Sequence, residues 1–154
     1  MPQQIIVDQK MIEHLDLTAA APIIESLASE PLKGVRTVRF DIEYPKAPED
    51  PRELPEIPEV RLWFIRLDAH YPWLPYLLDW RAGELTRYAA MLVPHQFTKE
   101  GLVFNPEALE LFVMNKVFTV GLWLHHRGIE NRSELRNLAQ TLGYTLDPQF
   151  FELL

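Results

Sequence analysis

The strictest pattern in this chain is an alternation of apolar and polar residues within residues 35–44. The apolar positions are Val38, Phe40, Ile42 and Tyr44, and the polar positions are Thr37, Arg39, Asp41 and Glu43. Successive side chains of a β-strand point to opposite faces, so the pattern predicts a strand with one buried and one solvated face. The fold is therefore expected to contain a β-sheet.

A second apolar segment runs from Val60 to Leu67. Its apolar residues are Val60, Leu62, Trp63, Phe64, Ile65 and Leu67. A run of this length that is rich in branched and aromatic residues is typical of a central strand, and we expect a strand here. The long loop before it permits antiparallel pairing with the first strand but does not require it.

The remaining segments predict helices. The clearest covers residues 105–127, where Asn105 can cap the N-terminus, Pro106 fits the first turn and Gly128 is a natural stop. Its interior is apolar over more than one face, which predicts extensive burial. Other helices are expected after Thr18, at residues 82–92 and at 133–142, with one more turn within 148–154. These elements predict a single-domain α+β fold, with a small antiparallel or mixed sheet packed with several helices.

Size and composition exclude several classes of function. The 154 residues suffice for one domain with its own core. The chain has no cysteine, which excludes a disulfide framework, a cysteine nucleophile and any thiolate-bound zinc or iron–sulfur centre. A formal charge of −7 argues against binding nucleic acid or anionic membrane surfaces. Without a recognisable targeting or membrane-spanning pattern, we expect a soluble cytoplasmic protein.

Residues 45–58 form a proline-rich acidic loop, with prolines at 45, 48, 51, 55 and 58. The spacing of three matches one turn of a polyproline II helix, which would place successive prolines along one edge. From Asp41 to Glu59, seven acidic and two basic residues give a local charge of −5. Loops of this length are usually functional or disordered. Three interpretations stay open: a stiff solvated connector, a disordered tether, or an arm that docks to a basic partner through Glu49, Asp50 and Glu53.

The ionisable residues form no recognisable catalytic or metal-binding motif. His125 and His126 are adjacent, so on a helix their side chains diverge by about 100° and cannot easily share a metal ion. An alternative is a small hydrolase or metal-dependent enzyme that uses Asp68, His70, Asp79, Glu84 and His95. Because no nucleophile, phosphate-binding loop or oxyanion motif accompanies these groups, we expect no catalytic site, cofactor or metal.

Arginines and large aromatic residues concentrate between residues 61 and 88. The partner-binding candidates among them are Arg61, Trp63, Arg66, Trp73, Trp80, Arg81 and Arg87. Arginine and tryptophan often anchor protein interfaces because each combines large buried area with directional bonding. The competing interpretation is that the tryptophans are core residues and the arginines pair with the many carboxylates. Three of the four tryptophans lie within eighteen residues, which favours a partner surface.

The same region carries a family resemblance. Residues 40–97, FDIEYPKAPEDPRELPEIPEVRLWFIRLDAHYPWLPYLLDWRAGELTRYAAMLVPHQF, are similar to the chlororespiratory reduction factor six family of cyanobacteria and chloroplasts. The resemblance implies a soluble factor that helps to assemble the hydrophilic arm of the photosynthetic NAD(P)H dehydrogenase-like complex. It implies the iron–sulfur subunit NdhI as the partner. The lack of an organelle-targeting pattern makes the chain resemble the cyanobacterial type.

The leading hypothesis from the sequence is thus a non-catalytic assembly factor. The acidic loop would steer toward a basic patch on an immature subunit, and the Arg/Trp region would supply the contact area. A permanent structural subunit is a third class of function. It differs from an assembly factor because it would remain in the mature complex.

Overall fold

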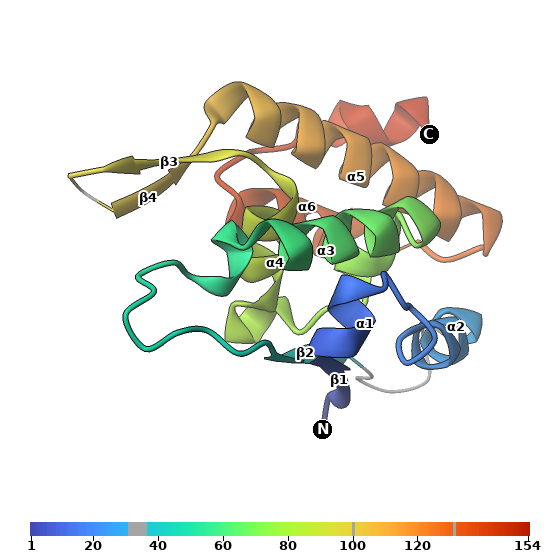
Figure 1. Cartoon of the computed structure of the whole chain (residues 1–154). Helices are drawn as coiled ribbons and strands as arrows, with labels where there is room; N and C mark the ends of the chain where they lie inside the picture. The colour runs from blue at the N-terminus through green and yellow to red at the C-terminus, as the bar shows by residue number, and fades with distance from the viewer. Residues whose placement is uncertain (31–36, 100, 131) are drawn as a thin grey trace. The chain divides into compact units, whose positions relative to one another are not determined.

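The computed structural model describes residues 1–30, 37–99, 101–130 and 132–154 (Figure 1). The chain divides into two compact units, Met1–Leu92 and Val93–Leu154. Each unit combines helices with a two-stranded sheet, so the predicted α+β class is confirmed. That the whole chain is a single domain stays a prediction.

The sheet of the first unit pairs strands β1 (Gln3–Asp8) and β2 (Val38–Glu43) in parallel. The predicted alternation is confirmed in β2, where Val38 and Phe40 are buried while the three charged residues between and after them are exposed. Residues 35 and 36 of the predicted strand lie outside the described residues. The backbone N–H of Val38 also donates to the carbonyl of Leu77 at 2.7 Å, so β2 lies between β1 and the segment around Leu78.

The predicted second strand is wrong, because Val60–Leu67 lies inside helix α3 (Pro58–His70). The side chains that α3 buries are Val60, Trp63, Phe64 and Leu67, at the i, i+3, i+4 and i+7 positions of a helical face. Leu62 and Ile65 complete the apolar run but are 50% and 44% exposed. These two exposed residues concealed the helical period in the sequence. Consequently β2 pairs with β1 and not with this segment.

Besides α3, the first unit contains several short helical segments. They are α1 (Gln9–Glu13), α2 (Ala21–Ser29), the 3₁₀ turns η1 (Leu54–Glu56), η2 (Leu74–Tyr76) and η3 (Trp80–Ala82), and α4 (Glu84–Leu92). The core contains a set of edge-to-face aromatic contacts, in which Phe64 meets Phe40 at 5.2 Å, Trp63 at 4.9 Å and Tyr88 at 6.2 Å between ring centroids. These contacts join β2, α3 and α4.

The second unit begins with an antiparallel hairpin, β3 (His95–Thr98) and β4 (Gly101–Phe104), which the sequence did not predict. Helix α5 (Pro106–His126) follows, and Asn105 caps it by accepting hydrogen bonds from the backbone N–H groups of Glu107 and Ala108. Helix α6 (Arg132–Thr141) and the 3₁₀ turn η4 (Pro148–Leu153) complete the unit. The predicted helices are confirmed, but one face of α5 is exposed, contrary to the extensive burial expected.

Within the described ranges, no helix has the length and apolar character that crossing a bilayer requires.

Candidate functional site

Trp63 is a core residue and not a partner contact. Its side chain is fully buried, and its indole N–H donates to the backbone carbonyl of Asp16 at 2.8 Å. The ring also packs edge-on against Phe40 at 6.1 Å. The prediction that Trp63 contributes to a binding surface is therefore wrong, because α3 turns this face inward.

Arg61 serves mainly to join elements of the first unit. Its guanidinium donates to the carbonyl of Ala90 at 3.1 Å and so links α3 to α4. Burial lowers the pKa of Arg61, while the nearby carboxylate of Glu56 in η1 acts in the opposite direction. This half-buried position leaves Arg61 a minor contributor to any surface.

Arg66 and Trp73 lie at the surface of the first unit. Arg66 is exposed and has no hydrogen bond or ion pair to the residues described. Trp73 is half-buried and packs edge-on against Tyr71, with ring centroids 5.4 Å apart. The Tyr71 hydroxyl donates to Glu25 at 3.5 Å, and burial followed by that carboxylate raises the pKa of Tyr71.

A group of cationic and aromatic side chains gathers where η3 meets α4. We call it the basic–aromatic cluster, and its members are Arg39, Trp80, Arg81 and Arg87. Arg39 and Arg87 pair with Glu84, and Trp80 and Arg81 belong to η3 just before α4. Glu84 is 3% exposed, and its carboxylate lies 3.5 Å from the Nε of Arg39 and 3.5 Å from the Nη1 of Arg87. Burial raises the pKa of Glu84, and the two arginines oppose that effect.

The backbone explains why these residues meet. The N–H of Asp79 donates to the carbonyl of Val38 at 3.1 Å, so the chain enters η3 directly beside β2 and Arg39. Gly83, with φ of 85°, then makes the left-handed turn from η3 into α4. Trp80 is half-buried, whereas Arg81 is exposed and unpaired among the described residues.

The sequence identified Trp80, Arg81 and Arg87 but missed Arg39. The only signal for Arg39 was its place on the outward face of the alternating strand β2. The buried carboxylate of Glu84 lies within 3.5 Å of two guanidinium groups, those of Arg39 and Arg87, and Asp79 is a second acidic group near it. Three arginines against Glu84 and Asp79 leave this region with a formal charge of +1 on a chain whose formal charge is −7.

The groups proposed for an enzyme serve other contacts. Asp68 accepts a hydrogen bond from the hydroxyl of Tyr88, and Glu84 binds the two arginines of the cluster. Asp79 lies close enough to Glu84 to raise the pKa of Glu84 further. His70 is exposed at the end of α3, and His95 belongs to the second unit. In the described parts of the chain, no three metal-binding side chains form a group that could hold an ion. The enzyme alternative is not supported.

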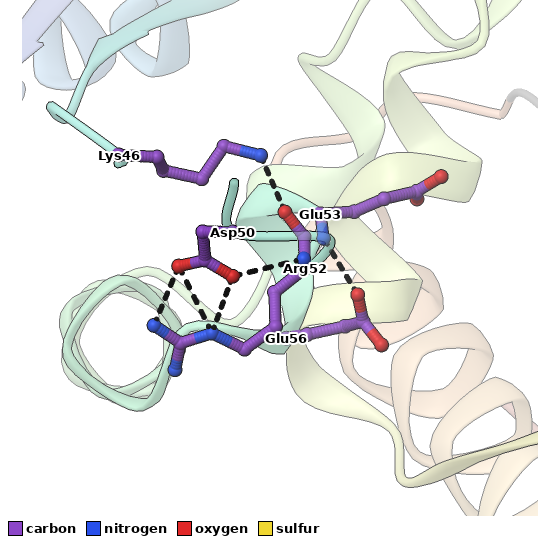
Figure 2. A network of polar contacts seen from close by, with 5 residues as sticks. All are labelled: Lys46, Asp50, Arg52, Glu53 and Glu56. Atoms are coloured by element: carbon purple, nitrogen blue, oxygen red, sulfur yellow. Dashed lines mark hydrogen bonds and ion pairs between the residues drawn. The ribbon is translucent and has the colours of Figure 1, made fainter. Parts of the chain in front are cut away.

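The loop at residues 45–58 has a path defined by its own hydrogen bonds (Figure 2). Asp50 accepts from the Arg52 side chain at 2.8 Å and 3.1 Å, and from the Arg52 backbone N–H at 3.0 Å. Lys46 donates to the carbonyl of Arg52, and the N–H of Glu53 donates to Glu56 at 2.6 Å. These contacts favour an ordered loop over a disordered tether.

The predicted continuous polyproline ribbon is wrong at one point of this loop. The N–H of Asp50 donates to the carbonyl of Ala47 at 2.9 Å, which closes a turn with Pro48 at its second position. A polyproline II helix has no internal hydrogen bonds, so the turn interrupts it. Proline at the second position is favoured because its fixed φ suits the turn.

Acidic groups remain at the surface of this region. The Arg52 guanidinium lowers the pKa of Asp50 to about 2, so Asp50 is engaged inside the loop. Glu49 and Glu53 are exposed. At the start of the loop, Tyr44 has a raised pKa because of burial first, then because of the carboxylates of Glu59 and Glu13. The acidic surface thus includes the end of α1 and the start of α3.

The fold and these surfaces define a class: an α+β protein that presents an acidic loop and a basic–aromatic cluster on one unit. The chain belongs to the chlororespiratory reduction 6 family, because the sequence model of that family matches residues 7–153. The resemblance seen in residues 40–97 therefore extends over nearly the whole chain. The family is linked to chlororespiratory reduction and to assembly of the NAD(P)H dehydrogenase-like complex. No solved structure matches this chain.

Proposed function

We propose that this protein is a non-catalytic assembly factor that binds an immature subunit of the NAD(P)H dehydrogenase-like complex in the cytoplasm. The subunit we propose is the iron–sulfur protein NdhI. The observation that carries the proposal is the basic–aromatic cluster, in which Arg81 is exposed beside the half-buried Trp80 and makes no ion pair or hydrogen bond to the residues that the structure describes. Such groups can gain both buried area and hydrogen bonds on meeting a partner.

The charge distribution supports a partner that has both an acidic and a basic surface patch. The cluster begins near Arg39, whereas the acidic loop begins after Tyr44 at the other end of β2. Five residues of extended strand separate the two positions by roughly 16 Å. A partner that places an acidic patch near Arg81 and a basic patch near Glu49 would fit both, and opposite charges would steer its approach.

The contribution of each predicted residue follows from its place in the first unit. Arg66, Trp73, Trp80, Arg81 and Arg87 supply surface to the proposed site, with Glu49 and Glu53 at the acidic loop. Asp50 acts indirectly, because its carboxylate holds Arg52 and fixes the path of the loop. The absence of cysteine accords with a factor that handles a cluster-bearing subunit without carrying the cluster.

The test is affinity capture of the tagged protein from the native cell, followed by mass spectrometry. We expect NdhI to be enriched and the protein to be missing from the purified mature complex. Retention of the protein in the mature complex at one copy per complex would establish a permanent subunit instead. Capture without any enrichment of NdhI would refute the proposed partner.

A further inference from the structure

Helix α5 carries an exposed apolar stripe outside the unit that holds the proposed site. Its members are Leu111, Met114, Phe118 and Leu122, which are 64%, 50%, 40% and 43% exposed. Spacings of three and four residues place them along one side of the helix. Other positions of α5, such as Val113, Val117 and Val120, are buried. The helix is therefore apolar on two sides, and one of them is largely exposed to solvent. Phe118 on that side also packs edge-on against Phe150 of η4, with ring centroids 4.9 Å apart.

The positions of the stripe and of the charged residues that flank it are nearly symmetric about one point. Exposed Glu107 lies four residues before Leu111, and exposed His125 lies three residues after Leu122. The pairs Glu107 with His125, Leu111 with Leu122, and Met114 with Phe118 are all centred on residue 116 to within half a residue. A two-fold axis through that point maps each member of a pair onto the position of the other.

We propose that α5 pairs with α5 of a second copy of this chain in an antiparallel, two-fold symmetric dimer. In this arrangement Glu107 of one copy meets His125 of the other, and the same pair forms again at the far end. At the centre, Met114 of one copy packs against Phe118 of the other, a favourable sulfur–aromatic contact. Parallel pairing would instead set Glu107 against Glu107.

The size of the stripe sets the expected strength of the dimer. From Leu111 to Leu122 the helix rises about 16 Å. Four partly exposed side chains fall short of the roughly 800 Å² that each partner buries in a standard interface. The dimer is therefore weak and forms at high protein concentration. A helix from an unrelated protein could also cover the stripe, but it would not require the two-fold pattern.

The first test is sedimentation velocity of the full chain over a wide range of concentration. We expect a concentration-dependent monomer–dimer equilibrium, and Met114→Glu should weaken it by about tenfold or more. The matched control is Leu62→Glu, which alters an equally exposed apolar residue on α3. The proposal is overturned if the wild type stays monomeric throughout, or if both folded variants behave alike.

A charge-exchange series tests the pairing of the ends. Glu107→Lys and His125→Glu should each weaken the dimer, because each places like or unpaired charges opposite one another. In the double variant the positive charge lies at position 107 and the negative charge at position 125, so opposite charges meet again and the wild-type association should recover. Both changes oppose the α5 dipole, so recovery in the double variant cannot come from a better helix. A double variant weaker than either single variant would contradict the antiparallel pairing.

Cysteine crosslinking tests the orientation, since the chain has no cysteine of its own. Asn115 is exposed and lies one residue from the proposed axis, so Asn115→Cys should form a disulfide between copies on mild oxidation. Glu107→Cys should not, because antiparallel pairing separates the two copies of position 107 by about 27 Å. Crosslinking at both positions would indicate parallel helices and would overturn the proposal.

Discussion

Trp63 and Trp80 are seventeen positions apart in the chain but occupy different environments. The indole of Trp63 is closed off from solvent and bound to the carbonyl of Asp16, whereas Trp80 lies partly at the surface beside Arg81. Trp63 therefore stabilises the first unit, and Trp80 is available to a partner. A substitution at Trp63 therefore affects folding, whereas a substitution at Trp80 affects binding.

Substitution of the two tryptophans should give different losses of stability. Trp63→Ala is expected to lower the free energy of unfolding by about 3–5 kcal/mol, because it leaves a cavity in the core. Trp80→Ala should cost less, on the order of 1 kcal/mol, since much of its side chain already meets solvent. Urea denaturation followed by circular dichroism measures both. Equal losses would contradict the different burial of the two side chains.

Sequence reasoning located part of the candidate site at the level of single residues. Trp80 and Arg81 were predicted because arginine and tryptophan are common interface residues. In the structure Trp80 is half-buried and Arg81 is exposed. Trp63 shares that chemistry, but its burial depends on which face α3 turns inward. Arg39 was missed because its role depends on Glu84, 45 residues later in the chain. Such long-range contacts leave no local pattern.

At the scale of elements, the loop at residues 45–58 shows how a charged segment becomes ordered. Asp50 and Arg52 form a charge-assisted contact two residues apart, and Pro48 preorganises the turn before it. The loop therefore presents Glu49 and Glu53 from a restrained backbone. Less conformational entropy is lost when such a loop binds a partner.

The contact within the loop predicts an unusual titration. The pKa of Asp50 should be about 2, and Arg52→Gln should raise it toward the ordinary value of 3.8. Carbon-13 NMR of the side-chain carboxyl measures both values. Because the folded pKa is lowered, the stabilisation is complete above pH 3.8 and is lost as pH falls through about 2. An unchanged Asp50 pKa in the Arg52 variant would show that the contact does not form.

The elements themselves differed in how far the sequence determined them. Strand β2 was predictable because a period of two residues does not match the period of a helix. Helix α5 was predictable because Asn105 and Pro106 mark its start. Helix α3 was mistaken for a strand because Leu62 and Ile65 extend its buried face into a continuous apolar run. The hairpin β3–β4 was missed because two strands of four residues are too short to show a period.

At the scale of the whole molecule, charge is distributed unevenly. The chain has a formal charge of −7, yet Arg39 and Arg87 pair with the buried carboxylate of Glu84, and the exposed Arg81 lies three residues before it in the chain. The acidic loop starts at the opposite end of β2. A surface with both signs of charge favours one orientation of a partner over others, since the reversed approach brings like charges together. This bipolar surface is the central claim of the proposed function.

The most direct test of that claim is a binding titration between purified protein and purified NdhI. The wild type is compared with Arg81→Glu, and the control is Arg136→Glu, an exposed arginine of α6 in the second unit. We predict that Arg81→Glu weakens binding by about tenfold or more, that the control binds like the wild type, and that added salt reduces the difference. Equal affinity of the wild type and a correctly folded Arg81→Glu protein would contradict the account.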